Sequence, residues 1–168
     1  WRLKVAISTT VKVARDGSIV LSDGTGSPLT HTVSYEEGDF SLSPDKEERV
    51  VIRDRGVIAG LRKGDAPVPT FSFSVYMRDF MDAAGLNIID VIEKTNSASA
   101  WLSTGGAGYE QYLIDLAFTA EGTDHGDTGD HTVTLTKCLL TWEFSEAKDG
   151  NKITVNGEVY GTAVRTEA

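Results

Sequence analysis

The chain has 168 residues, of which 40% are hydrophobic and 24% are charged, and its formal net charge is −9. Those proportions are ordinary for a globular protein and predict one domain, residues 1–168, while the negative charge argues against a protein that grips nucleic acid by neutralising phosphates. No apolar run approaches the roughly 18 residues of a membrane span. Because Cys138 is the single cysteine, the chain has no internal disulfide.

The first half of the chain predicts short β-strands. Alternating apolar and polar residues, or short apolar runs between turn residues, predict strands at residues 3–13, 19–22, 30–37, 39–43, 49–61 and 70–77. The pair Asp16-Gly17 is favoured in tight hairpin turns, and a glycine divides the fifth segment into two strands. In the sixth segment, Phe71, Phe73 and Val75 share one face.

One segment has helical rather than strand periodicity. Leu86, Ile89 and Ile92 form an apolar stripe that ends before Thr95. This spacing predicts a short helix, stopped by the polar residues that follow. Residues 97–108 are then expected to form a loop.

The second half returns to strands. Residues 112–120 predict a strand with the even-numbered residues inward and Leu113 outward. In the longest strand, residues 131–144, the apolar side chains change parity, and a β-bulge near Lys137 would restore a single buried face. Residues 149–161 supply a turn and a last alternating strand. Many short strands with one helix predict a mainly β fold: a β-sandwich or β-barrel-like core with one short flanking α-helix.

The segment Gly122–His131 carries three aspartates and two histidines between glycines. It lacks the spacings of zinc sites and of twelve-residue calcium loops, so we expect a connecting loop without a bound metal. No nucleophile elbow or phosphate-binding glycine loop is present, and Cys138 falls on the apparent core face of a strand. These patterns give no support for catalysis, so we expect that the protein is not an enzyme.

Charge is distributed unevenly along the chain. No Lys or Arg occurs between residues 94 and 137, whereas Glu110, Asp115 and Glu121 fall in that stretch. Residues 44–56 instead mix both signs densely. A solvated face explains either run; the alternative is that one surface is acidic and another is a charge-paired contact.

Residues 54–75, DRGVIAGLRKGDAPVPTFSFSV, contain an Asp-Arg-Gly sequence, a short strand, a basic-Gly-Asp turn and a strand in which Phe and Ser alternate. This segment resembles the tail tube proteins, or major tail proteins, of long-tailed bacteriophages. Further landmarks appear in the order of that family over nearly the whole chain: VLSDGTG, YEEGDFSLS, LNIIDVIEKT, AFTAEGTDHGDTGDHTVTLTKC and DGNKITVNGEVYG.

The resemblance implies a structural virion protein without catalytic residues or cofactor. Six copies would form a ring, and stacked rings would form a hollow tail tube through which DNA and a tape-measure protein pass on ejection into the host. The implied partners are further copies of the chain, the tape-measure protein, and tail terminator or baseplate proteins, with DNA passing without specific binding. The implied location is the phage tail, after assembly in the cytoplasm of the bacterial host.

Two sets of residues are candidates for roles in such a tube. The mixed-charge stretch is expected to fix the register between rings, because opposite charges select a matching surface. Its candidates for the contact between rings are Asp45, Lys46, Glu47, Glu48 and Arg49. An acidic bore would repel DNA phosphates and let the genome slide. The candidates for lining the bore are Glu110, Asp115 and Glu121.

Two other functions stay open at this point. One is a β-sandwich module that binds carbohydrate or protein through Trp101, Tyr109 and Tyr112. The other is the inner tube of a contractile tail or of a secretion system, which shares the fold that the resemblance implies.

Overall fold

The computed structural model describes residues 17–33, 40–44, 48–76, 85–121, 129–146 and 151–167. The strand expected at residues 3–13 lies outside these ranges, and so do Asp45, Lys46 and Glu47. Among the residues described, no helix has the length and apolar character that crossing a membrane requires.

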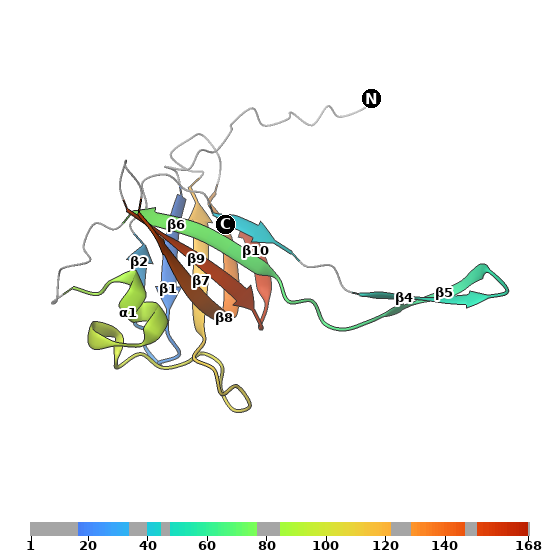
Figure 1. Ribbon diagram of the computed structural model, residues 1–168, viewed down its shortest axis with the longest axis horizontal. Coiled ribbons are helices and arrows are strands. Elements are labelled where there is room, and N and C mark those ends of the chain that lie inside the picture. Colours follow the sequence, from blue (N-terminus) through green and yellow to red (C-terminus); the bar gives the residue numbers. More distant parts are fainter. Residues whose placement is uncertain are drawn as a thin grey trace, which may run out of the picture.

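Most strands belong to one antiparallel sheet, in the order β2-β1-β7-β8-β9-β6-β3, with β10 also paired to β8 (Figure 1). The bounds are β1 Gly17–Ser22, β2 Thr30–Val33, β3 Ser41–Ser43, β6 Thr70–Tyr76, β7 Ile114–Ala120, β8 His131–Ser145, β9 Lys152–Val159 and β10 Ala163–Glu167. These strands confirm the mainly β fold class, and they lie within or close to the segments that alternation predicted.

The sheet curves around its inner face. Phe40, just before β3, stacks on Phe118 of β7 with ring centroids 4.6 Å apart, and it also lies 6.2 Å from Phe71 of β6. Four strand spacings separate β3 from β7 along the sheet, which would be about 19 Å if the sheet were flat. The stacked rings therefore require the sheet to curve strongly, so that the β3 side approaches β7 across the inner face.

The core fills this curved inner face. The alternation predicted for β6 is confirmed, since Phe71, Phe73 and Val75 are buried. Trp101, from the loop before β7, is 2% exposed. The prediction that Leu113 points outward is wrong: the residue is buried, because it precedes the first paired residue of β7 and its N–H donates to Ser103 Oγ at 3.0 Å.

The helix is shorter than its apolar stripe. Helix α1 spans Ile88–Glu93 and is capped by Asn87, whose side chain accepts a hydrogen bond from the N–H of Asp90. Lys94 ends the helix in a left-handed conformation, and the 3₁₀ turn η2 (Asn96–Ala98) follows. The helix packs against β2 and β8, and Trp142 Nε1 donates to Glu93 Oε1 at 3.0 Å. These contacts confirm the single flanking helix.

The bulge predicted near Lys137 is confirmed. Ile114 of β7 stands opposite Cys138 and Leu116 opposite Leu135, so two residues of β8 face Asp115 alone. Lys137 has a positive φ of 56°, and its N–H donates to Asp115 Oδ1 at 2.9 Å. The extra residue restores the parity of the strand, which leaves both Leu135 and Cys138 fully buried.

Strands β4 (Arg49–Asp54) and β5 (Val57–Lys63) form a separate two-stranded sheet. Figure 1 shows this hairpin projecting far from the main sheet, joined to it through β3 on one side and β6 on the other. Arg55 and Gly56 form its turn, with positive φ values of 47° and 87°. At its base the N–H of Gly64 donates to the carbonyl oxygen of Glu48 at 2.6 Å. Residues 48–65 are called the arm below.

Gly157 of β9 makes room for the ring of Phe71, because a Cβ at this position would lie 2.2 Å from Phe71 Cζ. We expect Gly157→Ala to lower the free energy of unfolding by about 1–3 kcal/mol, the usual range for overpacking. Urea denaturation measures this change. Gly26→Ala is the control, since no atom lies within 4 Å of the added methyl there. Equal stability of the two variants would contradict the tight contact.

Candidate assembly surface

The arm exposes apolar side chains on a hairpin that no other described element covers. Val57, Ile58 and Leu61 are 60–70% exposed, and Val50, Val51 and Ile52 are 40–46% exposed. An isolated two-stranded hairpin is marginally stable at best in water, and contiguous exposed apolar surface marks sites of association. The arm is therefore the leading candidate for an assembly surface.

Strand register gives the arm two faces. Directly opposed residues share a face, and alternate residues along a strand do so as well. Arg49 pairs with Lys63 and Val51 with Leu61. The register then shifts between Ile52 and Arg53, and after the shift Arg53 pairs with Ile58. We call the face with these six residues the cationic face. The opposite face carries Val50, Ile52, Asp54, Val57 and Arg62.

Charge separates the arm from the rest of the chain. The arm has five cationic residues and three anionic residues, which gives it a net charge of +2. Since the whole chain carries −9, the remaining residues carry −11. A cationic, apolar arm on an acidic body is complementary in charge to a second copy of the same body.

Of the five candidates for the contact between rings, Glu48 and Arg49 are described, and both lie at the base of the arm, exposed. The sequence pointed to this region through its charges and missed the apolar residues Val51, Ile58 and Leu61 beside them. A run that is apolar on both faces is typical of a strand buried on both sides, so the pattern itself gave no sign of exposure.

The three candidates for lining the bore lie in or next to one strand, β7. Glu110 lies in the loop before β7, Asp115 lies within β7 and is half-buried, and Glu121 directly follows the strand. Glu110 and Glu121 are exposed. Although their stretch of sequence holds no cation, the fold brings Lys137 to it from β8: its N–H binds Asp115, and its Nζ lies 4.6 Å from the centre of the Tyr109 ring.

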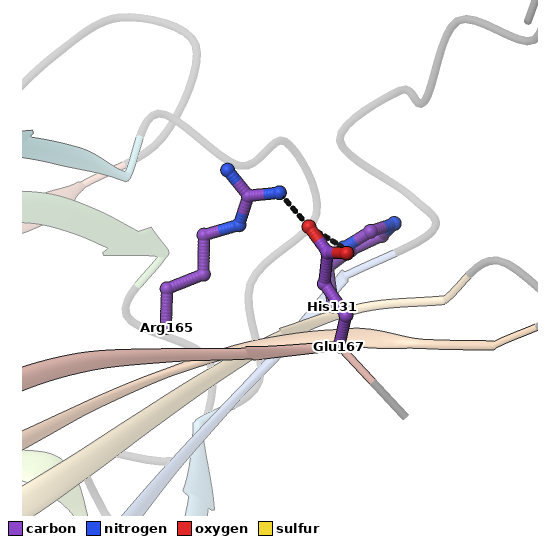
Figure 2. Close-up of polar contacts among 3 residues, drawn as sticks. All are labelled: His131, Arg165 and Glu167. Carbon is purple, nitrogen blue, oxygen red and sulfur yellow. Dashed lines mark hydrogen bonds and ion pairs between the residues drawn. The ribbon is translucent and has the colours of Figure 1, made fainter.

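Only the end of the segment Gly122–His131 lies among the described residues, and there His131 belongs to a strand. His131 Nδ1 lies 3.7 Å from Glu167 Oε1, which also pairs with Arg165 (Figure 2). Across the described ranges, no three His, Cys, Asp or Glu side chains gather into a group that could hold a metal. Residues 122–128 lie outside those ranges, so the metal-free loop stays a prediction.

The expected result for this loop is that neither EDTA nor added Ca²⁺ or Zn²⁺ changes the melting temperature. Glycines between the carboxylates let them point apart into water rather than converge on a cation. A site filled at a hundred times its Kd would instead stabilise the fold by about 2.7 kcal/mol. A calcium-dependent rise in a calorimetric melting curve would show that the loop holds metal.

The three aromatic residues considered for a binding module do not form an exposed platform. Trp101 lies in the core. Tyr112 is half-buried, and burial, with a smaller contribution from the charge of Asp23, raises its pKa to about 12. Tyr109 is exposed, but Lys137 lies over its ring. The side chains therefore do not favour recognition of a sugar ring by stacking.

Cys138 is equally unsuited to nucleophilic chemistry. Its side chain is fully buried in β8, and this burial raises the pKa of the thiol to about 12. A thiol that stays protonated at neutral pH is a weak nucleophile. Cys138 therefore acts as a small apolar residue of the core.

Together these features define a class of protein by its fold: in the described residues, a curved antiparallel sheet, one flanking α-helix and a projecting hairpin arm. Similar solved structures include parts of the anti-feeding prophage and of an extracellular contractile injection system. The chain is similar to a structure of the anti-feeding prophage tube terminating cap, with a TM-score of 0.62, 9% identity, and coverage of 98% of this chain and 96% of that chain.

Two further similar structures come from an extracellular contractile injection system, PVC. The sheath/tube terminator gives a TM-score of 0.59 at 11% identity, covering 96% of this chain and 99% of that chain. The sheath-tube complex gives 0.58 at 10% identity, covering 96% and 95%. The sequence matches no model of a known protein family and no curated protein.

Identities of this size show the fold alone. The shared fold is the mainly β fold that the resemblance implies, and the similar structures are parts of contractile injection systems rather than major tail proteins of long-tailed phages. The contractile alternative considered from the sequence thus has direct structural neighbours.

Proposed function

We propose that the chain is a structural subunit of a phage-tail-like tube, in which copies form rings, six to a ring, and the rings stack into a conduit. The observation that carries this proposal is the arm, which holds apolar side chains on both faces outside the core. The fold shared with tube and tube-terminator structures supports it. No catalytic residue or cofactor has a part in this function.

A neighbouring copy that covers the arm would bury its exposed apolar side chains. Fully burying a side chain such as Val, Ile or Leu contributes about 1.5–3 kcal/mol, and the arm exposes six of them. The arm and the body are different surfaces, so a contact between them is heterologous and either closes into a ring or continues as a filament. A stacked ring does both.

The proposal gives a role to each set of candidate residues. Glu48 and Arg49 lie at the base of the arm, where rings would meet, and with residues 45–47, which precede them in the sequence, they would set the register between rings. Glu110, Asp115 and Glu121 would face the bore along β7, so that its negative charge keeps DNA from adhering. The tape-measure protein, a terminator and baseplate proteins are the further proposed partners, and the phage tail or a similar extracellular assembly is the proposed location.

A second candidate function is the terminator that ends such a tube. Two of the similar structures are described as a tube terminating cap and as a sheath/tube terminator. A terminator forms a ring by the same lateral contacts, but it does not continue the stack.

Electron microscopy of the purified chain, with light scattering at several salt concentrations, tests both functions. Tubes of stacked rings are expected for a tube subunit, and rings that do not elongate for a terminator. A species that stays monomeric at high protein concentration in every salt condition would overturn both.

A further inference from the structure

A groove of about 330 Å³ lies on the outer face of the main sheet, across β3, β6, β9 and β8. Strand register explains its lining, because outward side chains of neighbouring strands line up in rows. One row runs through Thr141, Asn156, Ser72 and Ser41, and the next through Leu139, Glu158, Thr70 and Ser43. The lining is thus rich in hydroxyls and contains no Lys or Arg.

This groove is suited to a partner that brings cations and hydrogen-bond donors. The hydroxyls of Ser41 and Ser72 already bond each other at 2.9 Å, which leaves acceptor capacity on both oxygens. Glu158 is exposed and adds a carboxylate at one side of the groove. Leu139 supplies apolar surface next to these polar groups.

We propose that the arm of one copy docks with its cationic face in this groove of a second copy, and that Arg53, near the tip of the arm, pairs with Glu158. The arm and the groove are complementary in charge and both have apolar surface. The cationic face alternates Arg and Lys with Val51, Ile58 and Leu61. The groove has a carboxylate and hydroxyls beside an apolar side chain. The net charges of +2 for the arm and −11 for the remaining residues also favour attraction between the arm and a second copy. This inference rests on the proposed function and names the acceptor surface that the function leaves open.

The position of the groove gives the contact a direction. Strands β3 and β6 form one side of the groove and also lead into and out of the arm, so the groove lies at the root of the arm (Figure 1). Strands of six and seven residues reach about 20 Å, and the figure shows the arm extending away from its own body. Each arm therefore ends at the root of the next one, and the contact repeats in a single direction.

The first experiment fills the groove with a cation. Thr141→Arg places a guanidinium in the groove on an exposed side chain of β8, whereas Thr166→Arg makes the same change on exposed β10, outside it. We expect Thr141→Arg to raise the protein concentration needed for assembly at least about tenfold, with Thr166→Arg like wild type and both melting temperatures unchanged. Normal assembly of Thr141→Arg would overturn the groove as acceptor.

The second experiment exchanges the proposed ion pair. Arg53→Glu and Glu158→Arg should each weaken assembly, and the double variant should recover most of it. Arg62→Glu is the matched control, because it makes the same charge change on the opposite face of the arm. Failure of the double variant to recover, while wild type assembles, would overturn the pairing and leave the tube proposal intact. A wild-type chain that never assembles would instead remove the proposed function itself.

Discussion

Changing Val51, Ile58 and Leu61 to Asp together is expected to give a folded monomer that no longer assembles. These side chains share the cationic face of the arm and are 40%, 60% and 62% exposed, so none of them stabilises the core. If a neighbouring copy buries them, each contributes about 1.5–3 kcal/mol to association. Losing all three should weaken association at least about a thousandfold.

Size-exclusion chromatography with light scattering measures the loss of assembly, and urea denaturation measures the fold. The control is the pair Phe144→Asp and Val164→Asp, which removes apolar side chains of similar exposure from strands of the body. If the arm variant unfolds at lower urea than wild type, the arm supports the fold, and the assignment of the arm to assembly is wrong. Assembly that persists in a stable arm variant contradicts it as well.

Asp23→Ala is expected to lower the free energy of unfolding by about 2–5 kcal/mol. Asp23 is 3% exposed, directly follows β1 and begins the turn region that leads to β2. One carboxylate oxygen accepts from the N–H of Leu29 at 2.7 Å and from Thr25, and the other accepts from the N–H of Leu102 at 2.9 Å. Alanine leaves two partly buried N–H groups, those of Leu29 and Leu102, without this partner, and a buried group left unsatisfied costs about 1–3 kcal/mol.

Asp23 also predicts how stability depends on pH. Burial raises its pKa, but the hydrogen bonds from Leu102, Leu29 and Thr25 together outweigh burial and hold the pKa below its ordinary value of 3.8. A lowered folded-state pKa stabilises the fold above the unfolded pKa, and that stabilisation disappears as pH falls through the folded pKa. Urea denaturation between pH 2 and pH 7 should therefore show a loss of stability below about pH 4 that is smaller in Asp23→Asn. Identical acid profiles would contradict this role.

The sequence predicted the parts of the fold that depend on local periodicity. Alternation located β6 and its buried phenylalanines, and the change of parity in residues 131–144 located the bulge at Lys137. Contacts between segments that are distant in the sequence produce no such periodic pattern. Asp23 has the pattern of an ordinary turn residue, yet it binds Leu102, 79 residues away, and Trp101 belongs to a loop although it is a core residue.

The candidate site was predictable only in part for a related reason. Mixed charges drew attention to residues 45–49, next to the arm, but exposure depends on where a hairpin projects. Residues 50–52 and 57–61 are apolar on both faces, a pattern that strands buried in a sheet also show. Only the three-dimensional fold, in which β4 and β5 pair with each other and with no other described strand, shows that these residues face outward.

The separation of the arm from the core has an evolutionary consequence. Among the described residues, every buried core side chain comes from outside residues 48–65. If the arm docks on a second copy as proposed, substitutions in the arm change partner choice without a penalty in folding. Mutations there are free to accumulate as long as a matching groove changes with them, and arm and groove should vary together among descendants of this chain. Grafting residues 48–65 onto another protein of this fold would then transfer the identity of its neighbour while leaving the recipient body unchanged.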